Sequence, residues 1–198
     1  MNKKIVFIFA IICITVFLIF YYIFCISGNN IIRNQNELLE DIFENLEEYE
    51  ANIDVTVVSN KNENVYNMQQ IVDEEFSRVI VNGPENVKGL EIELKDGNLK
   101  IINTKTNMEK IYENYKTEIN NSLFINSFIE EYKNNDTEIV ENESEILIKM
   151  NLEKDNNTYK KIKELYLDKQ SGLPIKLLIK DNVQNTNTSI VYNDIKIK

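Results

Sequence analysis

The sequence predicts an α+β protein in which an antiparallel sheet and two helices follow an N-terminal transmembrane helix. Three observations predict this class. An uncharged apolar run near the N-terminus has membrane-spanning length, and two later segments repeat apolar residues at helical spacing. The remaining segments alternate apolar and polar residues between short turns. Such segments are typical of strands, and their short connections favour an antiparallel meander over a parallel sheet.

The apolar run extends from Ile5 to Ile26. At about 1.5 Å per residue, a helix of this length measures about 33 Å, enough to cross a hydrocarbon core of about 30 Å. Lys3 and Lys4 stand before it and the next basic residue is Arg33, which places the N-terminus in the cytoplasm. We therefore predict that residues 1–28 form an uncleaved signal-anchor, a single pass through the cell membrane.

Both cysteines, Cys13 and Cys25, lie in this anchor. Residues 29–198, predicted to form one extracytoplasmic domain, therefore contain no thiol, disulfide or cysteine metal ligand. Cleavage at a weak small-residue site over residues 25–27 remains an alternative. Lipidation of Cys25 is disfavoured, because Phe24 stands where a bacterial lipoprotein signal has a small residue.

The first half of the domain reads as a helix followed by strands. Apolar residues at i, i+3 and i+4 spacing predict an amphipathic helix over Gln35 to Glu50. Its acidic face is interpreted as solvated, because no calcium-binding loop accompanies it. Asp96-Gly97 is a hairpin turn signal. Alternating patterns predict strands at Ala51–Ser59, Val65–Asp73, Phe76–Val81 and Leu90–Leu94, a return strand from Leu99, and a short irregular strand over Met108–Tyr115.

The second half repeats this order, with a helix and then strands. Ser122 is a favourable N-cap for the helix. The apolar residues at helical spacing are Phe124, Ile125, Phe128, Ile129 and Tyr132. The strands that follow are predicted at Ile146–Leu152, within the hairpin Lys161–Asp181, and at Thr188–Ile197.

The hairpin Lys161–Asp181 carries the clearest pattern. Asp168 can accept a hydrogen bond from backbone that follows it, and Gly172 can adopt a positive φ. Pro174 cannot donate to a β-ladder, so it belongs at the first position of its strand or on a sheet edge. We interpret the segment as an ordinary antiparallel hairpin and its turn residues as fold markers.

Composition excludes most catalytic chemistry. The chain has 198 residues, a net charge of −10 and no histidine. An acidic chain is a poor partner for nucleic acid, so a basic protein or a neutral ligand is expected instead. Without histidine or an exported cysteine, the Ser-His-Asp, Cys-His and histidine-zinc sites are excluded. A carboxylate pair remains conceivable, but Asp54, Glu74 and Glu130 are no better placed than others. No catalytic, cofactor or metal residue is predicted, and no enzyme.

Four segments carry a family resemblance: residues 57–61 (VVSNK), 66–70 (YNMQQ), 84–90 (PENVKGL) and 165–174 (LYLDKQSGLP). In order and spacing they resemble clostridial germination lipoproteins of the GerS type, which look like members of the LolA/LolB/LppX superfamily. The resemblance covers most of Glu37–Lys198. It implies a curved antiparallel half-barrel with helices on its concave face, where the helix around Phe128 would act as a lid.

The resemblance also implies a function. GerS-like proteins are not enzymes, and the family implies binding and activation of a cortex peptidoglycan amidase, CwlD, during spore formation. In a sporulating cell, the domain would then lie in the space between the two forespore membranes. The chain departs from the family pattern in having no convincing lipidation motif at Cys25, and a transmembrane anchor could replace the lipid.

Two alternatives stay open. One is a LolA-like carrier or sensor of a lipid or lipoprotein, which is disfavoured if Phe76, Ile92 and Leu152 fill the concave face. The other is an exported domain with a structural role. If a protein partner binds, the acidic helix Gln35–Glu50 or a sheet edge is the expected surface.

Overall fold

The structure, a computed structural model, describes residues 37–59, 62–115, 123–152 and 161–198. The chain divides into two compact units, Met1–Ile42 and Phe43–Lys198. Residues 37–42 of the first unit are helical, and the helix continues to residue 45 in the second. In these described ranges no helix is both long and apolar enough to cross a membrane. The predicted anchor lies outside them.

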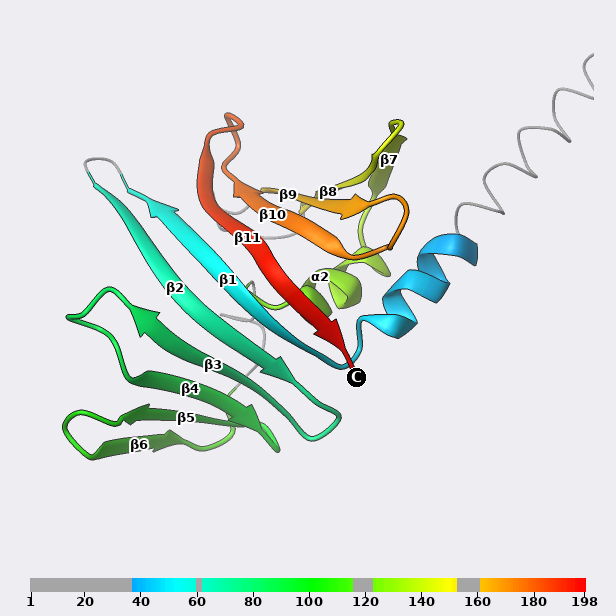
Figure 1. The fold of residues 1–198 in the computed structure, drawn as a ribbon. Coiled ribbons are helices and arrows are strands. Elements are labelled where there is room, and N and C mark those ends of the chain that lie inside the picture. The colour runs from blue at the N-terminus through cyan, green and yellow to red at the C-terminus, as the bar shows by residue number, and fades with distance from the viewer. Residues whose placement is uncertain (1–36, 60–61, 116–122, 153–160) are drawn as a thin grey trace, which may run out of the picture. The chain divides into compact units, whose positions relative to one another are not determined.

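The second unit is built on one curved antiparallel sheet of 11 strands, with the helix α2 (Ile125–Tyr132) against it (Figure 1). The strand order across the sheet is β6-β5-β4-β3-β2-β1-β11-β10-β9-β8-β7. The strands are β1 (Tyr49–Val58), β2 (Glu63–Val72), β3 (Phe76–Gly83), β4 (Leu90–Lys95), β5 (Asn98–Asn103), β6 (Met108–Tyr112), β7 (Thr137–Glu141), β8 (Glu145–Asn151), β9 (Ile162–Asp168), β10 (Pro174–Lys180) and β11 (Thr186–Ile197).

Two meanders make up this sheet. Strands β1 to β6 pair with their neighbours in sequence, and so do strands β7 to β11. The pairing of β1 with β11 joins the two halves, and Lys198 N donates to Glu48 O at 3.2 Å where that pairing ends. The predicted antiparallel meander is therefore confirmed, and the helix between β6 and β7 marks the change from one half to the other.

The sheet has an apolar inner face and a polar outer face. Directly opposed residues of antiparallel strands share a face, so the register places Ile53, Leu177 and Leu165 on the inner face. These side chains are buried, and so is Phe128 of α2, which is 0% exposed. The outer face carries the alternate residues, among them Asp54. The core of the unit therefore lies between the inner face and α2.

The turns follow the expected chemistry. Asp168 Oδ1 accepts hydrogen bonds from Ser171 N at 2.8 Å and from Ser171 Oγ at 2.7 Å. Gly172 has a φ of 71° and its N–H donates to Asp168 O. Pro174 is the first residue of β10. Asp96 and Gly97 both have positive φ, as a two-residue hairpin turn of type I′ requires. The predictions for both hairpins are confirmed.

The predicted helix Gln35–Glu50 is too long at its C-terminal end. Helical residues end at 45, and Tyr49 is the first residue of β1. Tyr49 fits the helical spacing of the preceding apolar residues, but it also begins the period-2 series that continues through Ala51 and Ile53. Pairing with β2 and β11 supplies more backbone hydrogen bonds than another helical turn, so the strand begins earlier.

The N-cap prediction also needs correction. Ser122 lies outside the described residues, and the N-cap position of α2 is Phe124, which makes no side-chain capping bond. Instead, the Ile125 N–H donates to the hydroxyl of Tyr49 at 3.3 Å. A tertiary contact therefore takes the role that local sequence assigned to serine.

Candidate interaction surfaces

The three carboxylates considered for catalysis do not form one site. Asp54 lies on the outer face, where it accepts hydrogen bonds from the side-chain amides of Asn67 at 2.5 Å and Asn193 at 2.8 Å. Glu74 and Glu130 line one pocket instead.

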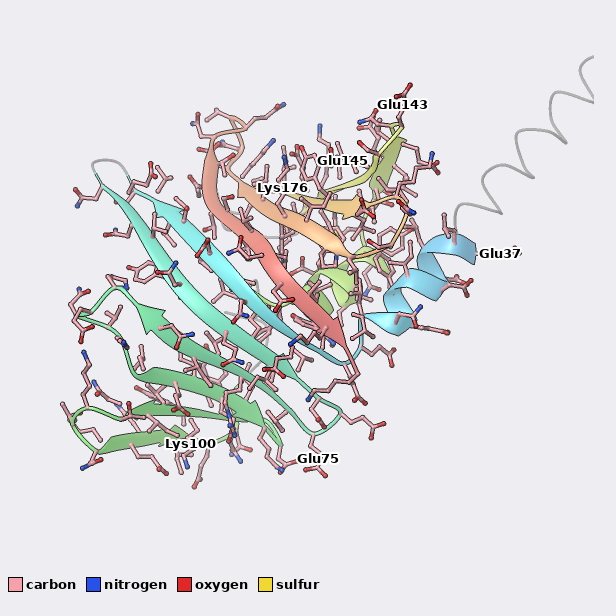
Figure 2. The ribbon with its side chains drawn as sticks, viewed as in Figure 1. Glu37, Glu75, Lys100, Glu143, Glu145 and Lys176 are labelled. Atoms are coloured by element: carbon pink, nitrogen blue, oxygen red, sulfur yellow. The ribbon has the colours of Figure 1, made fainter. Side chains whose placement is uncertain are left out.

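The pocket shared by Glu74 and Glu130 has a volume of about 280 Å³ and an acidic lining. Its other lining residues are Glu47, Glu48, Asp73, Asn126, Ile129 and Lys133. A neighbouring pocket of about 210 Å³ shares Asp73 and Glu74 and includes Glu75, which is labelled in Figure 2. In the described part of the chain, no cluster of three or more Cys, Asp or Glu side chains is arranged to hold a metal ion. The pockets therefore define an acidic end of the sheet.

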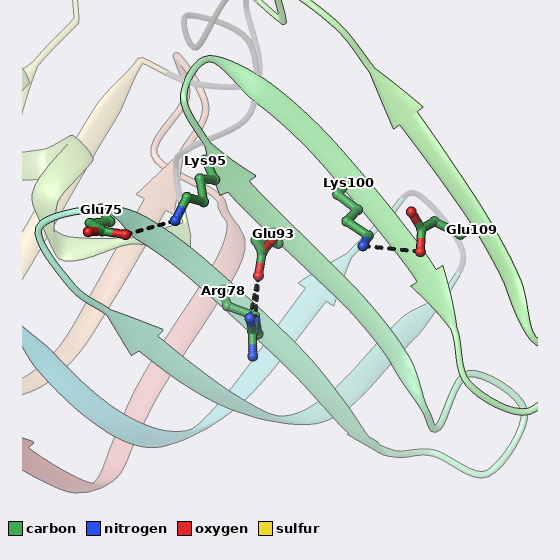
Figure 3. A network of polar contacts seen from close by, with 6 residues as sticks. All are labelled: Glu75, Arg78, Glu93, Lys95, Lys100 and Glu109. Atoms are coloured by element: carbon green, nitrogen blue, oxygen red, sulfur yellow. Dashed lines mark hydrogen bonds and ion pairs between the residues drawn. The ribbon is translucent and has the colours of Figure 1, made fainter.

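Ion pairs cross the outer face of strands β3 to β6. Figure 3 shows Arg78 on β3 paired with Glu93 on β4, and Lys100 on β5 paired with Glu109 on β6 at 3.1 Å. Lys95 contacts Glu75 at 2.8 Å. Arg78 also lies 5.0 Å from the centre of the Phe76 ring. These pairs hold neighbouring strands in register on a solvated face.

Phe76 is therefore on the wrong face for the role predicted for it. It is opposed to Lys95 and shares the outer face with Arg78, whereas Val79 and Ile92 lie on the inner face. Leu152 is buried at 6% exposure, as predicted, but Ile92 is only half-buried. The inner face is thus closed by side chains in its centre and more open toward β4.

A buried polar network lies beneath the N-terminus of α2. The Tyr49 hydroxyl donates to Gln70 Oε1 at 3.0 Å, and Gln70 Nε2 donates to Leu123 O at 2.7 Å. Burial raises the pKa of Tyr49 far above its usual range, and the hydrogen bond from Ile125 only partly opposes this. Burial, and secondarily the nearby Tyr49, also raise the pKa of Tyr192. Both phenols stay neutral at physiological pH, so the network positions α2 without charge.

A buried ion pair holds the other end of α2. Lys163 on the inner face of β9 is 1% exposed, and its ammonium lies 2.5 Å from a carboxylate oxygen of Glu131. The ring of Phe43 meets that of Tyr132 edge-on at 5.1 Å between centres. Lys163 was not singled out in the sequence, although its place in the series 163, 165, 167 puts it on the apolar face.

The outer face of the hairpin carries a second charged cluster. Glu164 accepts a hydrogen bond from the Tyr166 hydroxyl at 3.1 Å and pairs with Lys180 at 2.7 Å. Lys176 lies 4.0 Å from the centre of the Tyr166 ring. Burial, followed by the negative charge of Glu164, raises the pKa of Tyr166. This cluster stabilises the hairpin, in agreement with its interpretation as a structural element.

The two surfaces predicted for a protein partner are the acidic face of the first helix and a sheet edge. The described acidic side chains of the first helix at residues 37, 40, 41 and 44 are exposed, which confirms a solvated face. The sheet ends in two edge strands, β6 and β7. Every residue of β6 is exposed, whereas Thr137 and Ile139 of β7 are half-buried. Edge strands present unpaired backbone groups to other chains, so β6 is the more accessible of the two.

These features define a class of protein: an open antiparallel sheet with a packed inner face, charged surfaces and an accessible edge, typical of a binding scaffold. Residues 3–198 match the family described as "Sporulation protein YdcC-like", and the chain belongs to that family. It is thus a sporulation-associated protein. None of the curated proteins compared with it matches the chain.

Solved structures share the fold at low sequence identity. A chain in the structure of the CwlD amidase from Clostridioides difficile in complex with the GerS lipoprotein matches with a TM-score of 0.55 and 18% identity, over 84% of this chain and 95% of that chain. An uncharacterized conserved protein from Thermus thermophilus matches with a TM-score of 0.53 and 13% identity, over 83% and 88%. At the level of the fold, the predicted GerS-like relationship is confirmed.

A LolA superfamily protein, NE2245 from Nitrosomonas europaea, gives a looser match. Its TM-score is 0.40 at 13% identity, over 80% of this chain and 93% of that chain.

Proposed function

We propose that this chain is a non-enzymatic, membrane-anchored module that binds and activates a peptidoglycan amidase during spore formation. Residues 1–28 would anchor it in the cell membrane, with the sheet on the extracytoplasmic side. The sporulation family supports the setting, and the fold shared with a chain of the CwlD–GerS complex supports the kind of partner.

The observation that carries the proposal is the packed centre of the inner face. Ile125, Phe128 and Leu165 are all 0% exposed, so α2 and the sheet fill the space between them. With these side chains filling the space, the centre of the inner face has no room for acyl chains. This supports binding through the outer surface or the sheet edges, where a protein partner would dock.

Deletion and co-purification test this function. In a sporulating strain that lacks this chain, we expect spore cortex without amidase-dependent modification, and we expect the amidase to co-purify with the full chain from wild-type cells. Normal cortex modification in the deletion strain would overturn the proposal. A deletion strain that carries the full chain on a plasmid is the control and should restore the modification.

A lipid carrier or sensor is the second candidate, and one observation favours it. On the inner face of β4 and β5, Ile92, Leu94, Leu99 and Ile101 are only half-buried. Native mass spectrometry of the full chain, with an Ile92→Glu variant as control, separates the two functions. A stoichiometric lipid that the variant loses would support carriage, and a lipid-free wild-type chain would oppose it.

A further inference from the structure

Strand β6 is the last strand of the sheet in the part of the chain that the structure describes. Among the described strands it pairs with β5 alone, in a regular register from Leu99–Tyr112 to Asn103–Met108 without a bulge. It contains no proline. In an antiparallel pair, alternate residues direct their N–H and C=O groups away from the partner strand. β6 therefore offers a ready template for one more strand.

Strand β6 exposes apolar side chains on both of its faces, beside the charged Glu109 and Lys110. Met108 is 68% exposed and Tyr112 38% exposed on the inner face, and Ile111 is 54% exposed on the outer face. A strand added beside β6 would place its own side chains against these three and remove apolar surface from water. These exposed apolar side chains therefore lie where the side chains of an added strand would cover them.

The other edge strand, β7, is less exposed than β6. Two of its residues, Thr137 and Ile139, are half-buried, whereas every residue of β6 is exposed. The turn between β7 and β8 is also held by Lys169, whose ammonium lies 3.2 Å from the carboxylate of Glu141 and whose N–H donates to Ser144 O at 2.9 Å. Of the two described edges, β6 is therefore the more accessible.

The charged residues of β6 indicate which kind of strand would bind beside it. Lys110 stands between Met108 and Tyr112 on the inner face, with its ammonium 4.6 Å from the centre of the Tyr112 ring. Among the described residues it contacts no carboxylate, whereas Glu109 on the outer face is paired with Lys100. A second copy added antiparallel about Lys110 would set two lysines opposite each other, which is unfavourable. A carboxylate on a different chain would complement it.

We propose that β6 is the docking edge for an extended segment of the amidase partner, which adds a strand to the sheet. That segment carries a carboxylate opposite Lys110 and apolar side chains two residues away on each side, opposite Met108 and Tyr112. This assignment rests on the proposed function, and it specifies the surface and the chemistry of contact. Backbone hydrogen bonds to β6 supply affinity, and the carboxylate and apolar positions supply selectivity.

Two measurements on the full chain in detergent, with the purified sporulation amidase of the same organism, test the assignment. Hydrogen exchange should show protection of amides in residues 108–112 when the amidase is added. In a binding assay, Lys110→Glu should weaken the Kd about tenfold or more. The matched control is Lys176→Glu, which removes another lysine stacked on a tyrosine, on β10 at the other side of β1 and β11 (Figure 2). Its Kd should stay within about twofold of wild type.

The outcomes separate two failures. If the amidase binds but residues 108–112 gain no protection, or if both variants weaken binding equally, the docking edge is wrong while the proposed function survives. If the amidase does not bind the wild-type chain at all, both fall. Protection of residues 108–112 that grows with the concentration of this chain alone would identify a second copy as the occupant and overturn the assignment.

Discussion

The buried pair of Lys163 and Glu131 gives an asymmetric prediction for stability. Glu131→Gln removes the carboxylate that lies 2.5 Å from the ammonium of Lys163, a side chain that is 1% exposed. Breaking a buried pair from one side costs about 3–5 kcal/mol. The side chain of Glu131 is 34% exposed, so solvent screens the pair and we expect a loss of about 2 kcal/mol. Lys163→Met replaces the buried charge with an apolar chain of similar length and should change stability by less than about 1 kcal/mol.

Urea unfolding of the full chain in detergent, followed by circular dichroism, measures these differences. The control is Glu130→Gln, an exposed carboxylate on the same helix, which should shift stability by no more than about 0.5 kcal/mol. In the Lys163→Met background, Glu131→Gln should lose most of its effect. Equal losses for the two single variants, or an undiminished Glu131→Gln loss in the Met background, would refute the reasoning.

Three further predictions concern α2 and the hairpin. Phe128→Ala opens a cavity under α2 and should cost about 3–5 kcal/mol in urea unfolding. Tyr49→Phe leaves the Ile125 N–H without its buried acceptor and should cost about 1–3 kcal/mol, with faster hydrogen exchange at α2; unchanged exchange would exclude this cap. Hydrogen bonds from the Ser171 hydroxyl and backbone lower the pKa of Asp168. Because the folded pKa is depressed, this stabilisation is present above the unfolded pKa of about 3.9 and is lost as pH falls through the folded value. Acid unfolding of Asp168→Ala should thus show a smaller loss of stability below about pH 4 than wild type.

The strands predicted correctly are those in which the apolar residues alternate along the sequence and their side chains are buried in the structure. In β9, Leu165 and Leu167 alternate with Glu164 and Tyr166, and both leucines are 0% exposed, as is Leu177 opposite them in β10. Most inner-face positions beside α2 are apolar, so the alternation in the sequence indicates the register there. The two hairpin turns were also predicted correctly, because a positive φ, as at Gly172 and Gly97, restricts the residue type.

The errors occur where burial is weak or ambiguous. β7 was not predicted, since an edge strand buries little and its most apolar side chain pair, Ile139 and Val140, is contiguous rather than alternating. Phe76 was considered for the concave face but lies on the outer face, opposed to Lys95. Its ring contacts the guanidinium of Arg78, two residues along the same strand.

The same reasoning explains why surfaces for binding were harder to predict than the core. Gln70 and Lys163 are polar residues in apolar positions, and the reason for each lies on α2, in a different part of the sequence. Lys110 has the same alternating placement but is exposed, so water solvates its ammonium and no internal partner is required. Its charge is therefore available to a second molecule. Under the proposed docking, the described edge at β6 is where binding should be sought first.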